Sequence, residues 1–275
     1  MTQPRSINVC GEKFLMNIHP DDELASNLIR RDGVYSVNDL MVFRKFLREG
    51  DTFIDAGANI GWQTLFGASL VGTSGKVYSF EPNPKNLKVL RDNVNLNKFS
   101  QTVVSECALS NFCGHAGMYL SQDNFGDNLL ATKDLSGTHK EKAYVSCITL
   151  DMFLAEHEID GSRINLIKMD IQGSEALALA GMQRLIESHL PPIILEYAPN
   201  HLKWCGSSPF DILSFIDRYG YIPYQIREEK NLTPNTVLEK VTLQDIINAT
   251  NYLFSLPVAQ GVDFLLVQPK HLNLL

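Results

Sequence analysis

The segment of this chain best suited to bind a ligand is a glycine turn, Asp55–Gly61, which reads DAGANIG. An acid ends a short apolar stretch, and Gly57 and Gly61 precede a helical pattern. Glycine lets the backbone approach a ligand closely and adopt positive φ. In open α/β sheets, ligands bind beyond the carboxyl ends of the strands, where this turn is expected to lie. The turn therefore predicts a cofactor site.

Glu81 indicates which kind of cofactor the turn would bind. It ends the next predicted strand, and a carboxylate there can accept hydrogen bonds from both hydroxyls of a ribose. The glycine spacing differs from the Gly-x-Gly-x-x-Gly of dinucleotide sites, which disfavours a nicotinamide oxidoreductase. Asp55 would repel a phosphate but suits a cationic group. We therefore expect S-adenosyl-L-methionine, whose sulfonium and amino group carry positive charge.

Three stretches of the chain resemble the FkbM family of S-adenosylmethionine-dependent methyltransferases. Ile54–Thr64 is similar to motif I of that family, and Phe80–Asn83 to its second-strand acid. Thr149–Asp151, followed by Asn165–Glu175, is similar to its Lys-x-Asp-x-Glu-Gly-x-Glu signature. Gln172 departs from the signature because it stands where glutamate is more usual, which keeps an acceptor but loses the charge.

The resemblance covers about residues 50–200 and implies a fold, a cofactor and an activity. The fold would be the Rossmann-like class I methyltransferase fold, an α/β fold with a seven-stranded, mostly parallel sheet and helices on both faces. Asp55 and the backbone from Gly57 to Gly61 would hold the methionine end, Glu81 the ribose, and the loop after Ala108 the adenine. The expected cofactor-binding residues are Asp55, Gly57, Ala58, Asn59, Gly61, Gln63, Glu81, Pro82, Ala108 and Asp170. The best-known activity of the family is O-methylation of hydroxyls on polyketides and sugars.

Asp170, Glu196 and His201 are the candidate catalytic residues, because they end or follow two neighbouring predicted strands. Methyl transfer requires an aligned nucleophile and a group that takes or orients its proton. Histidine has an ordinary pKa suited to such work near neutral pH. Alternatively, Asp170 and Glu196 could together hold Mg²⁺ through oxygen ligands. Since only two carboxylates are well placed, we expect a metal-free mechanism.

Strands alternating with helices predict a parallel sheet with right-handed crossovers. The expected strands are Thr52–Asp55, Lys76–Phe80, Thr102–Glu106, Ile164–Met169, Ile193–Glu196, Tyr221–Ile226 and Val262–Val267, with a further pair, Ala116–Leu120 and Ala143–Ile148. The expected helices are Asn38–Arg48, Ile60–Val71, Pro84–Asn97, Thr149–His157, Ser174–Ser188, Pro209–Tyr219 and Thr242–Thr250.

The domain organisation follows from the same pattern. We expect a single methyltransferase domain over residues 51–275, with insertions at 111–148 and 227–260. It would be preceded by an extension, residues 1–50, that carries a helix and packs on the core. The loop Gln122–Gly137 is rich in Gly, Asn and Asp, which predicts a mobile lid over the adenine side of the cofactor.

Composition narrows the choice of partners and compartment. The 275 residues are 44% hydrophobic and 20% charged, with a net charge of −7, which disfavours a nucleic-acid-binding protein. Five cysteines without a Cys-x-x-Cys pair, no signal peptide and no apolar run long enough for a membrane span predict a cytoplasmic protein without membrane partners. We expect a small-molecule, glycan or natural-product acceptor. A nucleic-acid, peptide or carboxyl methyltransferase and a non-catalytic cofactor-binding subunit stay open as alternatives, and the sequence leaves the oligomeric state open.

Overall fold

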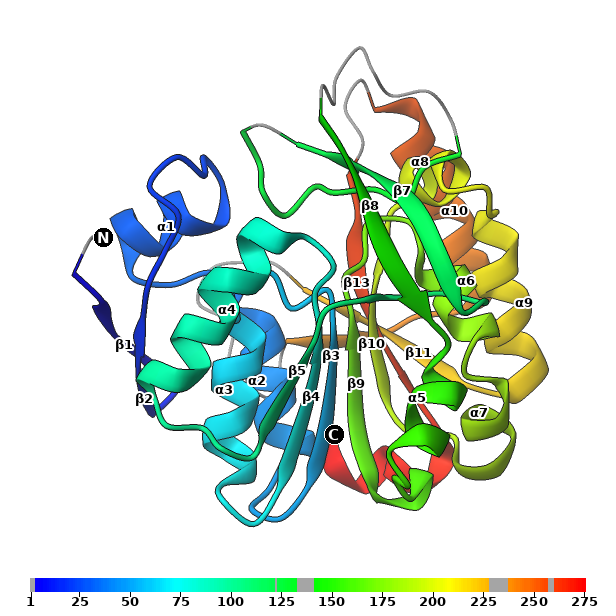
Figure 1. The fold of residues 1–275 in the computed structure, drawn as a ribbon. Helices are drawn as coiled ribbons and strands as arrows, with labels where there is room; N and C mark the ends of the chain where they lie inside the picture. The colour runs from blue at the N-terminus through cyan, green and yellow to red at the C-terminus, as the bar shows by residue number, and fades with distance from the viewer. Residues whose placement is uncertain (1–2, 122, 133–140, 228–236, 257–259) are drawn as a thin grey trace.

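The computed structural model describes residues 3–121, 123–132, 141–227, 237–256 and 260–275. Their centre is an eight-stranded sheet in the order β12-β11-β13-β10-β9-β3-β4-β5 (Figure 1). Its strands are β3 (Thr52–Ala56), β4 (Lys76–Phe80), β5 (Thr102–Ser105), β9 (Ile164–Met169), β10 (Ile193–Tyr197), β11 (Ile222–Ile226), β12 (Leu238–Lys240) and β13 (Val262–Val267).

The strand directions confirm the class I methyltransferase architecture. Neighbouring strands from β5 to β10 pair in parallel, whereas β13 lies antiparallel between β10 and β11. The expected count of seven strands is corrected to eight, because β12 adds a short antiparallel strand beside β11 at one edge. The carboxyl ends of β3, β4, β9 and β10 meet at one edge of the sheet, where this topology binds ligands.

Helices cover both faces of the sheet (Figure 1). One face is covered by α2 (Val37–Phe46), α3 (Trp62–Val71) and α4 (Pro84–Leu96). The other is covered by α5 (Leu150–Glu156), α6 (Glu175–Ala180), α7 (Gln183–His189), α9 (Pro209–Tyr219) and α10 (Leu243–Ser255). Successive side chains of a strand point to opposite faces. Phe53 therefore packs in the core under α2 and α3, while Ile54 packs in the core under α5 and α7.

A hairpin near the N-terminus was not expected from the sequence. Strands β1 (Arg5–Val9) and β2 (Glu12–Met16) pair through a turn at Cys10-Gly11, and α1 (Ala25–Asp32) follows before α2. Phe14 of β2 contacts Trp62 of α3 edge to face, with ring centroids 5.8 Å apart. The Asn97 side chain after α4 also bonds the backbone of Leu15. These contacts join the hairpin to α3 and α4.

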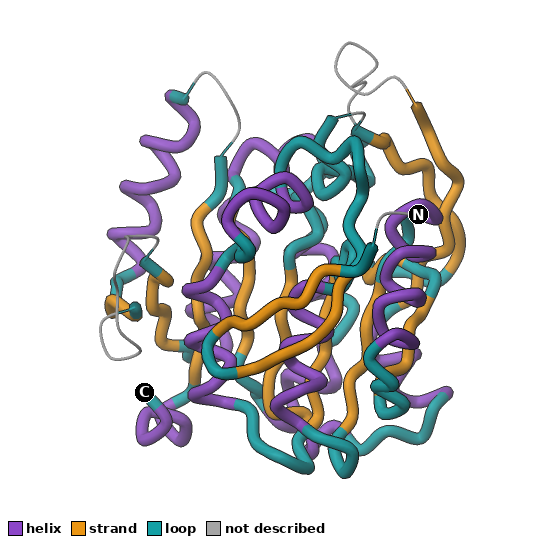
Figure 2. The backbone as a smooth tube through the Cα atoms, turned by 90° about the vertical axis from the view of Figure 1, so that its left-hand side faces the viewer, coloured by secondary structure: helices purple, strands orange, loops and turns teal. Residues whose placement is uncertain are grey.

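A second, smaller sheet lies beside the main one, with the order β6-β8-β7 (Figure 2). Its strands are β6 (Ala108–Leu109), β7 (Gly114–Leu120) and β8 (Glu141–Ile148), which confirms the expected antiparallel pair. Part of the expected lid, at 122 and 133–137, lies outside the described residues. Helix α8 (Pro199–Trp204) was not expected and follows β10 directly, and short 3₁₀ helices lie at Gly161–Arg163 and Pro269–Leu274.

The expected helix Ser174–Ser188 is in fact two helices, α6 and α7, divided at Gly181. A Cβ atom on Gly181 would lie 1.9 Å from the carbonyl oxygen of Ser110. Only glycine permits this close approach of the helix to the loop after β6. Gly181 therefore lets the end of α6 pack closely against that loop.

Candidate active site

The glycine turn after β3 packs closely against the carboxyl end of β9. The backbone N–H groups of Gly57 and Ala58 both donate to the carbonyl of Phe80, at 3.0 Å each. Gly57 has φ +83°, and a Cβ atom there would lie 1.9 Å from the carbonyl oxygen of Asp170. The N–H of Asp170 in turn donates to the carbonyl of Ala56 at 3.1 Å. The turn and Asp170 are therefore held together by the backbone.

Glu81 lies at the end of β4 and is only 5% exposed. One of its carboxylate oxygens accepts from the N–H of Asn59 and the other from the N–H of Asn83, each at 2.8 Å. Burial raises the pKa of Glu81 to about 7, against the lowering effect of these two bonds. Each carboxylate oxygen can accept a further hydrogen bond. Glu81 is thus fixed in position and keeps the capacity to accept from two hydroxyls, as a ribose requires.

Asp55 lies deeper, within the framework of the turn. It is 2% exposed, and one of its oxygens accepts from the Thr64 hydroxyl at 2.5 Å. The same hydroxyl lies 3.0 Å from that of Ser79. Burial raises the pKa of Asp55 to about 6, while the bond from Thr64 lowers it. These contacts connect β3, α3 and β4 under the turn, and contact of Asp55 with the methionine end stays a prediction.

The remaining expected cofactor residues surround the same strand ends. Asn59 has φ +49°, and its amide lies beside Gly126. Pro82 follows Glu81 and is half-buried, whereas Gln63 in the first turn of α3 and Ala108 in β6 are buried. Their contacts with a cofactor also stay predictions.

Lys168 forms the centre of a buried charge cluster that the sequence did not reveal. Its side chain is 1% exposed, and its ammonium lies 2.9 Å from Asp263, 3.6 Å from Asp39 and 4.0 Å from Asp170. Burial disfavours the charged ammonium, but these carboxylates raise the pKa of Lys168 well above its usual range. Lys168 is therefore a fixed cation that joins β9 to β13 and α2.

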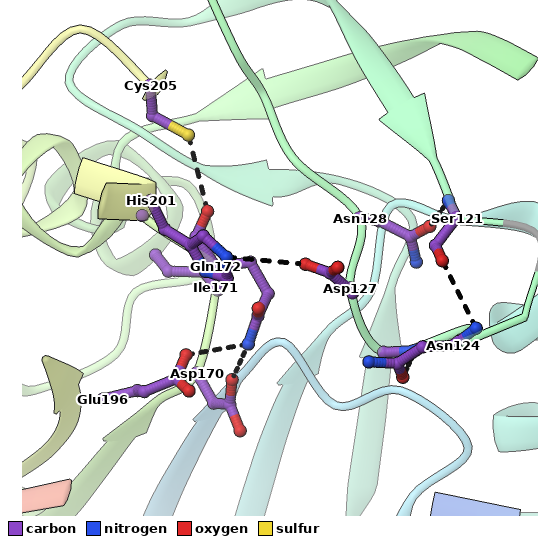
Figure 3. A network of polar contacts seen from close by, with 12 residues as sticks. Ser121, Asn124, Asp127, Asn128, Asp170, Ile171, Gln172, Glu196, His201 and Cys205 are labelled. Carbon is purple, nitrogen blue, oxygen red and sulfur yellow. Dashed lines mark hydrogen bonds and ion pairs between the residues drawn. The ribbon is translucent and has the colours of Figure 1, made fainter. Parts of the chain in front are cut away.

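Gln172 connects the two carboxylates predicted to be catalytic (Figure 3). Its amide nitrogen donates to an oxygen of Asp170 and to an oxygen of Glu196, at 2.7 Å each. Burial raises the pKa of Glu196 well above its usual range, and the charge of Asp170 raises it further. One ammonium therefore faces several carboxylates here, and crowding of like charges makes the ionised form of Glu196 less favourable.

His201 lies on α8, beside the backbone of the loop that follows β9 (Figure 3). It is 8% exposed, and its Nε2 lies 3.9 Å from a carboxylate oxygen of Asp127. Its ring also lies 5.2 Å from that of Trp204. The hydrogen bonds thus bring Asp170 and Glu196 together through Gln172, and His201 faces Asp127 in the described loop 123–132.

The structure also adds residues from outside the predicted set. Asp39 comes from α2, within the N-terminal extension, and Asp263 comes from the last strand. Burial raises the pKa of Tyr35, and the nearby charges of Asp170 and Glu196 raise it further. The buried Lys168 was visible in the sequence only as part of the signature segment. Asp39 and Asp263 gave no local signal, because only the fold brings them to β9.

Comparison with known proteins settles the family of this chain. The family model described as the methyltransferase FkbM domain matches residues 55–223, more than half of the sequence. The chain belongs to the FkbM methyltransferase family. A curated relative, the 31-O-demethyl-FK506 methyltransferase FkbM of Streptomyces tacrolimicus, is 31% identical over 161 residues. The match spans 50% of this chain and 61% of that relative.

Solved structures of methyltransferases are also similar to this FkbM family member. One is the methyltransferase FkbM of Methylobacillus flagellatus KT, with 18% identity, a TM-score of 0.41 and coverage of 73% of this chain and 49% of that chain. Another is the precorrin-6y C5,15-methyltransferase of Geobacter metallireducens GS-15, with 13% identity, a TM-score of 0.43 and coverage of 92% and 98%. Similarity at this level carries no information about the acceptor.

The family is one of S-adenosylmethionine-dependent methyltransferases, and S-adenosylmethionine is the cofactor of this chain. The residues present fit it, because Glu81 is held by two backbone N–H groups at the end of β4 and keeps free acceptor capacity. The turn at Gly57 lies between Glu81 and Asp170, at the strand ends where cofactors bind in this topology. Within the described residues, no helix combines the length and apolar character needed to cross a bilayer.

Proposed function

We propose that this methyltransferase methylates a hydroxyl oxygen of a small molecule, a sugar or a natural product, and that Asp170 receives the hydroxyl proton. The observation that supports this proposal most strongly is the position of Asp170. Its backbone bonds to the end of β3 beside the glycine turn, and its side chain is 31% exposed. Asp39 and Asp263, which also surround Lys168, are only 3% and 19% exposed. Asp170 is thus the most accessible carboxylate around that ammonium.

The chemistry assigns a simple task to each residue. The cofactor supplies a methyl carbon activated by its positive sulfur. As the acceptor oxygen bonds to that carbon, the carbon–sulfur bond would break, S-adenosylhomocysteine would leave, and the acceptor's proton would pass to the carboxylate of Asp170; positioning supplies most of the acceleration. Lys168 lies 4.0 Å from Asp170 and attracts its carboxylate by opposite charge, which keeps Asp170 in place. Glu196 accepts a hydrogen bond from Gln172, and burial raises its pKa well above the usual range. His201 is a second candidate for orienting the acceptor, from α8.

Two observations support the proposed class of acceptor: the name of the curated relative and the net charge of this chain. The relative's name, a 31-O-demethyl-FK506 methyltransferase, describes methylation at an oxygen, and the net charge of −7 disfavours a nucleic-acid acceptor. We further propose that the protein acts in the cytoplasm.

A panel of acceptors tests the proposal directly. Purified protein is incubated with labelled S-adenosylmethionine and with hydroxyl, carboxyl, amine, peptide and nucleic-acid acceptors. Label transfer confined to hydroxyl compounds is expected, and it should fall by about a hundredfold or more in Asp170→Asn. Asp217→Asn is the control, because Asp217 is an exposed carboxylate near the end of α9. Transfer to another class would replace the acceptor assignment, and cofactor binding without transfer to any class would favour a non-catalytic subunit.

A further inference from the structure

Gln172 has a backbone that directs its side chain back toward the strand ends. It has φ +50°, and Gly173 after it has φ +94°. A Cβ atom on Gly173 would lie 2.3 Å from the backbone of His201, so α8 fixes the turn from outside. The thiol of Cys205 also donates to the Gln172 carbonyl at 3.4 Å. These contacts hold the backbone of Gln172 in place, and its side-chain amide makes further contacts of its own.

The two carboxylates that the amide joins would otherwise repel each other. Leu195 pairs with Met169 across the parallel strands, so Glu196 and Asp170 come next to each other at the edge of the sheet. The ammonium of Lys168 is 4.0 Å from Asp170, and it donates its short hydrogen bond to Asp263 instead. The Gln172 nitrogen is 2.7 Å from one oxygen of each carboxylate. An amide NH₂ has two hydrogens, one for each of these oxygens.

We propose that Gln172 is a positioning residue whose amide nitrogen takes the place of a bridging divalent ion between Asp170 and Glu196. This inference rests on the proposed role of Asp170. A bridging ion would bond both carboxylates and draw both into the ionised form. The neutral amide holds the same two oxygens together and leaves one proton on the pair. Asp170 is then oriented and able to accept a proton without a metal.

The substitution Gln172→Glu should convert this arrangement into a cation site. Among the described residues, no three His, Cys, Asp or Glu side chains are now grouped to hold a metal ion. Q172E would bring a third carboxylate to the point that the amide nitrogen occupies. Calcium binds carboxylate oxygens at about 2.3–2.6 Å, so an ion held among the three carboxylates would lie beside that point, and the oxygens of Asp170 and Glu196, now 2.7 Å from it, would turn toward the ion.

Calorimetry with calcium chloride provides the first test. We expect Q172E to bind one calcium ion at millimolar concentration or below, and the native protein to bind at least tenfold more weakly. The control is Q183E on α7, where the exposed Gln183 amide donates to a single carboxylate, Glu187, at 2.6 Å. Both variants add one negative charge. A difference in their calcium affinity would therefore come from the arrangement of the ligands around the ion and not from charge alone. Binding of S-adenosylhomocysteine and the melting temperature establish that each variant is folded.

The pH profile of turnover provides the second test, with Gln172→Met. Methionine keeps the length of the side chain but donates no hydrogen bond. Losing a bond to the ionised carboxylate should raise the pKa of the pair, so the acidic limb of kcat should move up by about one to two pH units. The titratable groups facing the pair, which are unchanged in this variant, are Tyr35, Asp39, Asp55, Lys168, Glu175 and Asp263.

The two tests separate this inference from the proposed function. Calcium binding needs no acceptor, so its result does not depend on whether the methyl transfer has been assigned correctly. Equal calcium affinity in folded Q172E and Q183E would overturn the proposal. An acidic limb that stays in place in Q172M, while its kcat falls, would also overturn it, because the amide would then be a packing element only.

Discussion

Replacing Glu81 by glutamine should weaken cofactor binding without removing the side chain. In the native protein both carboxylate oxygens accept, one from Asn59 and one from Asn83. Glutamine keeps one acceptor oxygen but presents an NH₂ group to the other backbone N–H. One hydrogen bond of the turn is lost, and so is one of the two bonds expected to the ribose.

The magnitude follows from these lost bonds. A hydrogen bond to a charged group contributes about 1.5–3 kcal/mol, so the dissociation constant should rise by about ten- to a hundredfold in E81Q. Glu81→Ala should have an effect in the same range. Leaving one buried N–H of the turn without its acceptor should also lower the free energy of unfolding by about 1–3 kcal/mol.

The pH dependence of binding provides a sharper signature. The pKa of Glu81 is raised to about 7, and the ionised form is the one that accepts from both hydroxyls. As pH falls through 7, a proton bound to Glu81 must be released before the cofactor binds. The affinity of the native protein should therefore fall by about tenfold from pH 8 to pH 6. That difference should disappear in E81Q.

Calorimetric titration with S-adenosylhomocysteine at several pH values measures both effects. Glu106→Gln is a suitable control, because Glu106 is an exposed carboxylate that pairs with Arg91, at 3.3 Å. Its loss should leave affinity and pH dependence unchanged. If folded E81Q binds with native affinity at every pH, Glu81 does not hold the ribose and the reasoning fails.

Further expected outcomes concern the rest of the site. Gly57→Ala should abolish cofactor binding in calorimetry, because its Cβ atom would lie 1.9 Å from the Asp170 carbonyl, at φ +83°. Initial rates should show a loss of about a hundredfold or more in Asp170→Asn, and a smaller loss in His201→Ala. The native rate should survive EDTA, and a loss restored by Mg²⁺ would make Asp170 and Glu196 metal ligands. Hydrogen exchange in Gln122–Gly137 should slow when S-adenosylhomocysteine binds, whereas equal exchange would rule out a lid.

The parts of the fold that the sequence predicted are those with a strong local signal. The strand that ends at Asp55, the glycine turn and the strand that ends at Glu81 follow one another within a short stretch, and the structure confirms both strands. The missed elements had weaker signals. The hairpin turn at Cys10-Gly11 joins two strands of five residues each, and alternation over so few positions did not stand out. Strand β12 has three residues, too few for any period.

The division at Gly181 shows a different limit of predicting helices from the sequence. The apolar pattern runs without interruption through the expected helix, and a single glycine is tolerated in many helices. The helical hydrogen bonds stop here at Asp151, some thirty residues earlier in the chain: its N–H donates to the Gly181 carbonyl, and its carboxylate accepts from the N–H groups of Arg184 and Leu185. A contact of that range is visible only in the folded protein.

The candidate site repeats this contrast between local and distant signals. The sequence identified Asp170 and Glu196, since each ends or follows an apolar strand, but it assigned Gln172 only a loss of charge. The structure shows what the amide does instead, because it donates to both carboxylates. The ammonium of the cluster comes from Lys168 in β9. The residues on either side of it in that strand, Ile167 and Met169, are apolar and buried. A lysine there is stable only because distant carboxylates surround it, so charge balance at this site is a property of the fold rather than of the motif.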